Sequence, residues 1–462
     1  MNGQIKIKVN EKIISVDKGT RLSDVLDIEK PCGGKGTCGK CKVKVNGREE
    51  LACQYFVNSD VTVETREKNA IVSETGTDES GRLTENLCFA LDIGTTTLAL
   101  ALVSLDDKKT VKVVTATNPQ RAYGADVITR IDYCQHNSVK ALQDVLVDEI
   151  NRMIAELGVS ADTMYVSANV TMLHTLFGVD CTSIGIAPYT PSFLGWKKEN
   201  AKALGIHGVK EIISLPSISS FVGADIVAGL NLIGLPEDGK YNLLIDLGTN
   251  AEVVLYSNRS GVATAAAAGP CFEGANVSCG MSATKGAIYA FELNYGHAQY
   301  KTIQDEAPTG ICGTGLIDIV SELVKNEIID ETGYMDEDYG LSDEVYLSCE
   351  DVRQYQLAKS AVYSAVLSLM NTENVSFDDI SKMYISGGFS AKINISNAVS
   401  SGLLPRELAH KTVALNNSSL QGTVKYACEG GSIERFTDMI RYVDLSSNPY
   451  FSELFMENMM FS

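Results

Sequence analysis

Two stretches of this chain decide its fold: CFALDIGTTTLAL at residues 88–100 and NLLIDLGTNAEVV at residues 242–254. Each has an apolar run that contains Asp near its end, then a Gly-Thr turn, then a second apolar run. This pattern predicts two strands joined by a tight turn, in which glycine permits a close backbone approach. Because the pattern occurs twice, the sequence predicts an internal duplication.

A second pair of segments supports the duplication. MYVSAN at residues 164–169 is similar to MYISGG at residues 383–388, and each follows a segment with apolar residues at helical spacing. The two pairs are separated by unequal lengths of chain, so the second copy is expected to contain an insertion. The large part of the chain is therefore predicted to be a two-lobed, duplicated α/β fold with a central cleft.

The composition of the two Asp-x-Gly-Thr turns is typical of phosphate binding. Backbone N–H groups and Thr hydroxyls donate to phosphate oxygens, and an Asp at the end of a strand can hold Mg²⁺ through water. One such turn is also common in hairpins, so the prediction depends on the two copies facing each other. The candidate catalytic residues are Asp92 and Asp246. The candidate nucleotide-binding residues are Gly94, Thr95, Thr96, Thr97, Gly248, Thr249, Asn250 and, for adenosine, Gly387, Gly388 and Phe389.

A glycine-rich cysteine loop, PCGGKGTCGKCKVKVNGREELACQ at residues 31–54, holds four of the twelve cysteines. The spacing of Cys32, Cys38 and Cys41 is close to that of plant-type [2Fe–2S] ferredoxins. Asn46-Gly47 predicts a hairpin turn whose paired residue numbers sum to 93, which brings Cys53 beside Cys41. A zinc site made by the same four cysteines is the alternative. Zinc sites usually pair two C-x2-C units, and this loop has one.

The segment around the cysteine loop has the pattern of a small α+β domain. Residues 5–9 alternate as a half-buried strand does, residues 13–16 predict a second strand and residues 60–64 a closing strand. The spacing of apolar residues after Thr20 predicts a short helix. This order predicts a β-grasp, ferredoxin-like module over residues 1–66. A polar linker would follow at 67–86, and the two lobes would span 87–235 and 236–462.

The composition excludes several classes of protein. The chain has 462 residues and a net charge of −19, with 45% hydrophobic and 21% charged residues, as in a soluble globular protein of roughly three domains. Residues 1–66 have a net charge of +3, so the remainder carries −22. This acidity argues against a nucleic-acid partner. Because the sequence shows no apolar leader and no membrane span, we expect a cytoplasmic protein with reduced thiols and no membrane partner.

With these motifs, the chain resembles the acetate and sugar kinase/Hsp70/actin (ASKHA) ATPases. Residues 92–97 resemble their first phosphate motif, residues 246–250 the second, and residues 385–389 the adenosine motif. Joined to a ferredoxin-type module, the whole chain resembles the ATP-dependent reductive activators of corrinoid proteins. Further stretches that fit that family are residues 118–126, 169–174, 269–274 and 310–315, the last of which contains the candidate nucleotide-binding residue Gly313.

The resemblance implies an α+β β-grasp ferredoxin module followed by a two-lobed duplicated α/β actin-like ATPase. It implies an enzyme that passes one electron through a [2Fe–2S] cluster and uses ATP and Mg²⁺ to return Co(II) to Co(I) in a corrinoid protein of a methyltransferase system. The implied partners are the corrinoid protein and a low-potential electron donor, and a homodimer is left open. The short segment between the modules departs from the family, many of whose members have an extra linker domain there.

Other readings remain open on the sequence. The chain could activate another low-potential enzyme, such as a radical dehydratase, although those activators share a [4Fe–4S] cluster between subunits and lack an N-terminal ferredoxin. It could also be an actin-like assembly or redox-sensing protein that passes no electrons. Arg121, Asp126 and Arg130 could touch substrate or form a helix-surface ion pair. His174 and Cys312 are secondary candidates, and the cysteines outside the loop fit buried structural thiols.

Overall fold

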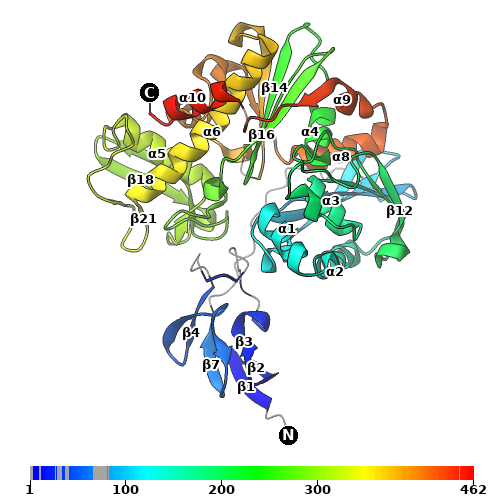
Figure 1. Cartoon of the computed structure of the whole chain (residues 1–462), viewed down its shortest axis with the longest axis vertical. Coiled ribbons are helices and arrows are strands. Elements are labelled where there is room, and N and C mark those ends of the chain that lie inside the picture. Colours follow the sequence, from blue (N-terminus) through cyan, green and yellow to red (C-terminus); the bar gives the residue numbers. More distant parts are fainter. Residues whose placement is uncertain are drawn as a thin grey trace.

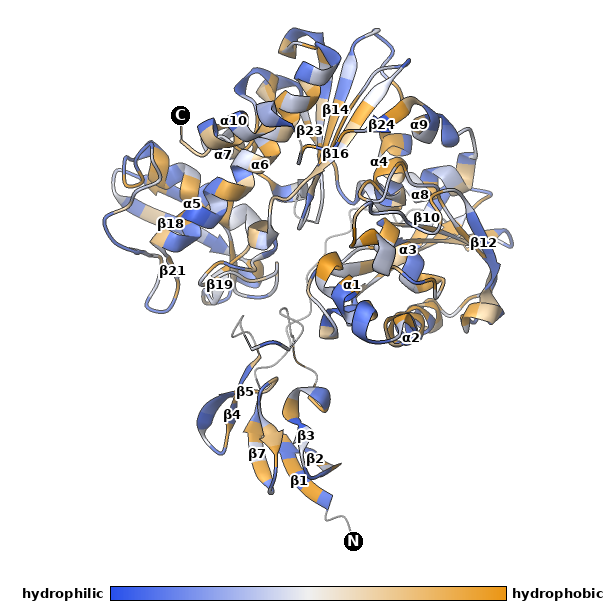
Figure 2. Cartoon of the chain, viewed as in Figure 1, coloured by the Kyte–Doolittle hydropathy of each residue, from blue (hydrophilic) through white to orange (hydrophobic). Residues whose placement is uncertain are grey.

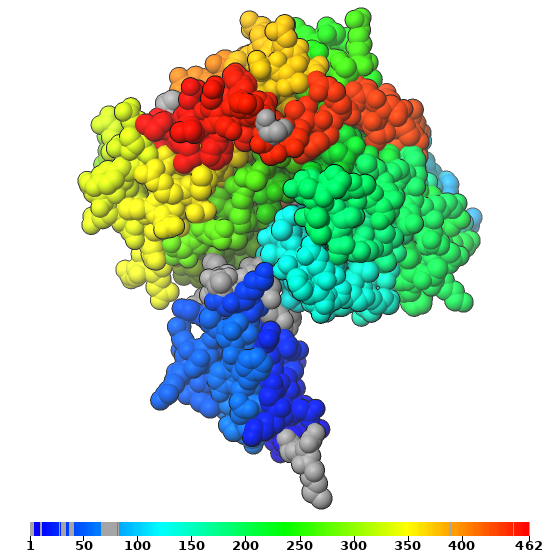
Figure 3. All heavy atoms as spheres, in the orientation of Figure 1, coloured from blue at the N-terminus to red at the C-terminus, as the bar shows by residue number. Residues whose placement is uncertain are grey.

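A small N-terminal sheet module projects from a much larger two-lobed body in this computed structural model (Figures 1 and 3). The structure describes residues 4–9, 12–26, 28, 34–36, 41–65, 81, 83–388, 390–446 and 448–461. Three predicted site residues lie outside the described residues: Cys32, Cys38 and Phe389. Most of the predicted linker at 67–86 does so as well.

The N-terminal module contains a mixed five-stranded sheet in the order β2-β1-β7-β4-β5. Its strands are β1 (Gln4–Val9), β2 (Lys12–Asp17), β4 (Lys42–Val45), β5 (Arg48–Leu51) and β7 (Val61–Glu64). The predicted hairpin register is confirmed, since Val45 pairs with Arg48 and Val43 with Glu50. Asn46 and Gly47 make the turn with φ of 49° and 81°, as a primed two-residue turn requires.

The short helix predicted after Thr20 is wrong in both start and type. Thr20 and Arg21 form strand β3 (Thr20–Arg21), which pairs with β6 (Phe56–Val57). Only a single 3₁₀ turn follows, over Leu22–Asp24. The apolar spacing that suggested a helix reflects the burial of Leu22 and Leu26 in the small core of the module.

The sheets of the two lobes share the order of five of their six strands, so the predicted duplication is seen in the topology. The sixth strand differs, because β12 pairs with β13 in the first sheet and β24 pairs with β16 in the second. The first sheet runs β10-β9-β8-β11-β13-β12 and the second runs β23-β22-β14-β15-β16-β24. In each, a three-stranded antiparallel meander continues into two parallel strands. The strands of the first are β8 (Leu87–Ile93), β9 (Thr97–Ser104), β10 (Lys109–Thr117), β11 (Ala161–Ala168), β12 (Lys197–Asn200) and β13 (Val209–Ser214); those of the second are β14 (Tyr241–Leu247), β15 (Ala251–Tyr256), β16 (Gly261–Ala266), β22 (Ile380–Ser386), β23 (Thr412–Ala414) and β24 (Ile440–Tyr442).

Helices cover these sheets, and the predicted insertion lies in the second copy. The helices are α1 (Val127–His136), α2 (Val139–Leu157), α3 (Val170–Leu176), α4 (Ala224–Ile233), α5 (Gly313–Lys325), α6 (Cys349–Glu373), α7 (Ile395–Ser400), α8 (Ser418–Glu429), α9 (Glu434–Met439) and α10 (Pro449–Glu457). The insertion adds α5 and the strands β17 (Ala287–Asn294), β18 (His297–Thr302), β19 (Gly310–Ile311), β20 (Tyr339–Gly340) and β21 (Tyr346–Leu347). Apolar residues gather on the central strands and polar residues on the outer helices (Figure 2).

Helices α4 and α8 pack together between the two lobes (Figure 1). One core joins residues of the first sheet and of α4 to Leu244 and Val254 of the second sheet. Helix α8 also packs on β8, β9 and β11, although it comes from the last tenth or so of the chain. Residues 236–462 therefore do not pack as an isolated lobe. Among the described residues, no helix is long and apolar enough to span a membrane.

Candidate functional site

The first Asp-x-Gly-Thr turn joins β8 to β9 and is held tightly by its surroundings. Gly94 donates its N–H to the Thr97 carbonyl at 3.0 Å, and a methyl group on Gly94 would lie 2.7 Å from that oxygen. Asn118 Nδ2 donates to the Gly94 carbonyl at 2.8 Å, and Asn169 Nδ2 donates to Thr95 Oγ1 at 3.2 Å. Both asparagines begin stretches, residues 118–126 and 169–174, that fit the family resemblance.

Arg130 holds the same turn from the protein interior. Its side chain is fully buried on α1, where Nη2 donates to the Thr95 carbonyl at 2.6 Å and Nε to the Gly124 carbonyl at 2.9 Å. Asp126 instead caps α1 by accepting the N–H of Thr129 at 2.7 Å. A helix-surface ion pair between Asp126 and Arg130 is one of the two possibilities that the sequence leaves open. The structure does not show it, because Arg130 is buried and donates to carbonyl groups of other segments, whereas Asp126 accepts from the start of its own helix.

The second turn joins β14 to β15 and faces the first. Gly248 donates its N–H to the Asn250 carbonyl at 2.9 Å. Glu273, at the end of the 3₁₀ helix Pro270–Glu273, accepts from Thr96 Oγ1 of the first turn at 3.3 Å and also bonds the Thr249 side chain of the second. A single carboxylate thus links the two turns across the lobes, as the prediction that they face each other requires.

Half-buried carboxylates surround these turns. Asp92 and Asp246 stand at the ends of β8 and β14, and Asp225 lies in the first turn of α4. Burial, followed by the charge of Asp246, raises the pKa of Asp225 to about 7. Burial also raises the pKa of Asp92 to about 7, partly offset by the hydrogen bond from Ser419 Oγ at 2.7 Å. The pKa of Glu252 is raised well above its usual value by burial and by Asp246. Carboxyl groups with pKa values raised in this way are suited to proton transfer near neutral pH.

Sequence reasoning did not single out Asp225, Glu252 or Glu273. Glu252 is one charge in an otherwise buried strand, which is a signal that could have been used. Asp225 opens an apolar helix, and an acidic residue there is ordinarily explained by the helix dipole. Only the contact between lobes distinguishes Glu273.

The predicted adenosine turn follows β22, next to the second phosphate turn. Gly387 has φ of 116°, and a Cβ there would lie 2.1 Å from the Leu247 carbonyl, whereas a Cβ on Gly388 would meet no atom within 4 Å. Gly387 is therefore required by packing, and the space beside Gly388 is open. Gly313 begins α5, where a Cβ would lie 2.1 Å from the Phe272 carbonyl, so this glycine allows α5 to approach the turn that carries Glu273.

In the N-terminal module, Cys41 and Cys53 are both buried at 1% exposure. The N–H of Ala52 donates to the Cys41 carbonyl at 3.0 Å, which holds the two cysteine segments side by side. Gln54 Nε2 donates to the Gly34 carbonyl at 2.8 Å and lies 3.6 Å from Cys53 Sγ. Gly36 has φ of 78°, and a Cβ on it would lie 3.0 Å from the Gln54 side chain. Gly34 and Gly36 therefore lie against Gln54, next to Cys53.

His174 and Cys312, the secondary candidates, are both buried and lie against backbone groups, as structural residues do. His174 is buried, its Nδ1 lies 2.8 Å from the Val170 carbonyl, and its Nε2 accepts the N–H of Ser192 at 3.0 Å. Burial lowers the pKa of His174, so its ring is neutral at physiological pH. Cys312 is 4% exposed, with Sγ 3.3 Å from the Ile288 carbonyl.

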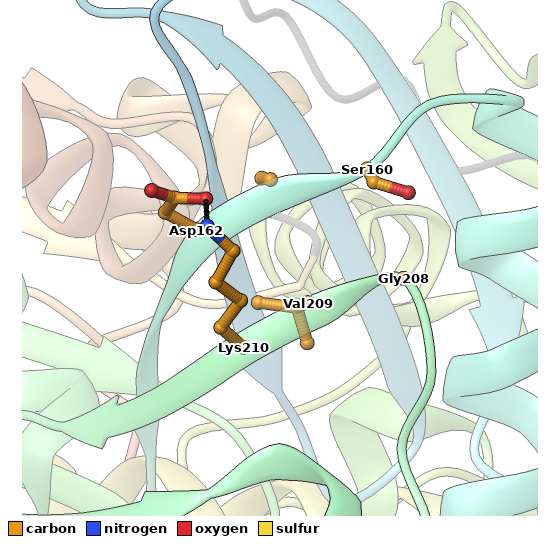
Figure 4. A pocket seen from close by; sticks show the side chains of 6 residues that line it. Ser160, Asp162, Gly208, Val209 and Lys210 are labelled. Carbon is orange, nitrogen blue, oxygen red and sulfur yellow. Dashed lines mark ion pairs between the residues drawn. The ribbon is translucent and has the colours of Figure 1, made fainter.

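A surface hollow of about 300 Å³ lies elsewhere, at the first residues of β11 and β13 (Figure 4). The ion pair between Lys210 and Asp162, 2.6 Å apart, borders it. Ligands of open α/β sheets bind at the carboxyl ends of the strands, where Asp92 and Ser167 lie side by side. The hollow is at the opposite ends of these strands, so it is not the candidate nucleotide site.

Comparison with known proteins adds independent findings. Residues 240–462 match a family model described as the C-terminal, ASKHA domain of RACo, and residues 87–238 match the RACo middle region. The chain is 26% identical to the corrinoid activation enzyme RamQ of Eubacterium limosum, with 98% of each chain covered. It is 25% identical to a [Co(II) methylated amine-specific corrinoid protein] reductase of Methanosarcina barkeri, covering 72% of this chain and 68% of the relative.

A solved structure, titled reductive activator for corrinoid, iron–sulfur protein, superimposes on this chain with a TM-score of 0.74 at 24% identity. The match covers 99% of this chain and 98% of the solved one. Since the identity is below 25%, this likeness shows the fold alone.

Proposed function

Because this chain belongs to the RACo family of reductive activators of corrinoid proteins, which carry an ASKHA ATPase domain, we propose that it uses ATP to drive single-electron reduction of Co(II) to Co(I) in a corrinoid protein. The observation that carries the proposal is the combination, in one chain, of two phosphate turns joined through Glu273 and a separate module with two buried, adjacent cysteine segments. ATP binding between lobes supplies the energy, and the cysteine module supplies the route for the electron. The corrinoid protein and a low-potential donor are the two partners.

In the cleft, the two turns would bind the phosphates of ATP through their N–H groups and through the hydroxyls of Thr95, Thr96, Thr97 and Thr249. Asp92 and Asp246 would orient Mg²⁺ through water. The described residues contain no group of three side chains placed to hold a metal by themselves. Mg²⁺ is usually held by one or two carboxylates together with substrate phosphates, and Asp92 and Asp246 would supply these carboxylates.

We propose Asp225 as the general base for ATP hydrolysis. Its carboxylate lies close enough to Asp92 and Asp246 for their charges to raise its pKa, and a pKa of about 7 is close to the optimum for accepting a proton from water. The Ile226 N–H donates to Asp225 Oδ1 at 2.9 Å and thereby holds its orientation.

The N-terminal module, in our proposal, is a β-grasp ferredoxin domain. Cys41 and Cys53 fit a cluster site because both are buried in neighbouring segments. The Gln54 amide also lies within reach of the Cys53 sulfur, as hydrogen-bond donors to ligand atoms do in metal sites. Cys32 and Cys38 would complete the four ligands of a [2Fe–2S] cluster, which supplies one-electron chemistry when bound. The packing around Cys41 and Cys53 excludes water from these two ligands, and the Gln54 side chain donates to one of them, Cys53.

The test uses the full-length protein, reconstituted with iron and sulfide without oxygen and mixed with a low-potential reductant and a Co(II) corrinoid protein. We expect Co(I) absorbance to appear with ATP and much more slowly with ADP. Equal rates with and without ATP would contradict the coupling. An iron content of two per chain, with the EPR spectrum of a reduced [2Fe–2S] cluster, distinguishes this protein from a dehydratase activator with a shared [4Fe–4S] cluster.

A further inference from the structure

Helix α1 contacts both the phosphate turn and the cysteine module. On its inner side, Arg130 donates to the Thr95 carbonyl at 2.6 Å. On its outer side, Asp132 forms an ion pair with Lys35 of the cysteine loop, with 3.0 Å between Oδ2 and Nζ. Residues two apart on an α-helix point about 200° apart, so one helix of ten residues presents these two side chains in opposite directions. Figure 1 shows α1 on the side of the body that faces the N-terminal module.

The inner contact ties α1 firmly to the turn. Arg130 also donates Nε to the Gly124 carbonyl at 2.9 Å and Nη1 to Gln120 Oε1 at 3.2 Å. Gly124 lies two residues before Asp126, which begins the α1 capping box, so the start of the helix and the turn share one guanidinium. A planar, five-donor fork holds several acceptors in a single geometry. Because Arg130 holds both, a movement of the phosphate turn would also move the start of α1.

The outer contact reaches a cluster-ligand candidate in few steps. Lys35 lies between Gly34, whose carbonyl accepts from Gln54 Nε2, and Gly36, where an added Cβ would lie 3.0 Å from the Gln54 side chain. Gln54 Nε2 is 3.6 Å from Cys53 Sγ. The Lys35 and Asp132 side chains are 63% and 44% exposed. Ion pairs of that exposure are weak, which suits a contact that forms and breaks during a reaction cycle.

We propose that α1 couples the nucleotide cleft to the electron-carrying module, with Arg130 following the phosphate turn inside and Asp132 engaging Lys35 outside. This inference rests on the proposed function and names two positioning residues for it. Neither residue supplies chemistry. Nucleotide binding at the turn displaces the start of α1, and the ion pair then changes the surroundings of Gln54 and the adjacent cysteine.

The experiment uses the full-length protein with its cluster reconstituted. Visible circular dichroism of the iron–sulfur chromophore is recorded with and without a non-hydrolysable ATP analogue, beside nucleotide affinity and ATPase rate. The variants are Asp132→Asn, Lys35→Gln and the charge swap K35D/D132K. The matched control is Asp144→Asn, which breaks an exposed ion pair to Lys140 on the neighbouring helix α2.

We expect the analogue to change the spectrum of the wild type and of the Asp144→Asn control. In Asp132→Asn and Lys35→Gln, this change should fall at least about fivefold, while nucleotide affinity stays within about twofold. The charge swap should restore most of the response. Arg130→Lys, which keeps the charge and loses the fork, should weaken both the response and nucleotide affinity. The double variant that combines Arg130→Lys with Asp132→Asn should have a spectral response no smaller than that of the more affected single variant.

Full spectral responses in Asp132→Asn and Lys35→Gln would overturn the proposal, and so would a wild-type chromophore that ignores the nucleotide. A charge swap that restores nothing would also count against an ion pair as the contact. Reduction of the Co(II) protein is measured in the same preparations. Wild-type protein that responds spectrally and yet fails to reduce Co(II) with ATP overturns the proposed function and leaves the role of α1 standing. Wild-type protein that reduces Co(II) with ATP but shows no spectral response to the nucleotide overturns only the role of α1.

Discussion

Asp225→Asn is expected to stabilise the nucleotide-free protein above neutral pH while it abolishes ATP hydrolysis. Burial and the nearby carboxylates raise the pKa of Asp225 from 3.8 to about 7. In the unfolded chain the carboxyl group ionises near its ordinary pKa, so between about pH 4 and pH 7 the folded state binds more protons than the unfolded one. By linkage, the free energy of unfolding then falls as the pH rises through this window. Removing the group should flatten that fall.

The size of the effect follows from the shift. A rise of about 3 pKa units corresponds to ~4 kcal/mol once the pH exceeds both pKa values. We expect roughly half of this, ~2 kcal/mol at pH 8, because an unpaired amide in the cleft carries its own desolvation cost. Near pH 4 the variant and the wild type should differ little. The stabilisation disappears when Mg²⁺ and nucleotide are added, since their charge favours the ionised carboxylate of the wild type.

Urea unfolding of the apo protein at several pH values between 4 and 8, read by circular dichroism, measures the difference. Asp162→Asn is the control, because Asp162 is an exposed carboxylate in the ion pair with Lys210, and it should give no gain that depends on pH. An Asp225→Asn stability difference that is the same at pH 5 and pH 8 would refute the electrostatic reasoning. Full ATPase activity in that variant would refute the role of Asp225 as the base.

Three further predictions follow from single contacts. Gly387→Ala should lower both the melting temperature and nucleotide affinity, because its Cβ would lie 2.1 Å from the Leu247 carbonyl. Gly388→Ala, at an open position, should fold normally and weaken only the binding of adenosine nucleotides. Equal losses of melting temperature in the two variants would contradict this reasoning. His174 has a lowered pKa, so stability should fall as the pH drops below about 6.5, and His174→Gln should remove that dependence in urea unfolding. Gln54→Leu removes a donor beside a candidate cluster ligand, so redox titration should give a lower cluster potential; an unchanged potential would exclude that donor role.

Much of the fold could be predicted because strand periodicity is local. Residues 88–100 and 242–254 carry their turns and both flanking strands within one window, and the Asn46-Gly47 turn specified its own register. The helix expected after Thr20 failed for the opposite reason. The backbone of Arg21 pairs with Phe56, a residue far along the chain. This long-range pairing overrides the local helix propensity.

The candidate site was predictable in its backbone and less so in its side chains. Glycines at the turns have steric reasons that a motif expresses directly, as Gly94 and Gly387 show. Glu273 and Arg130 act through contacts that only the folded lobes create. Asp126 and Arg130 have the spacing of an ion pair along a helix. At the start of α1, however, Asp126 accepts a backbone N–H and Arg130 donates to a backbone carbonyl instead.

Helix α8 has a consequence for how this protein is made. It packs on α4 and on the first sheet, and Ser419 bonds Asp92 of β8, yet about 185 residues separate the end of α4 at Ile233 from Ser418. At ~5–20 residues per second, the ribosome needs roughly 10–40 s to supply that helix after α4 has emerged. During this time the first sheet has one apolar face without its final cover. The nascent chain therefore presents an aggregation-prone surface, and the first lobe cannot complete its core until helix α8 has been translated.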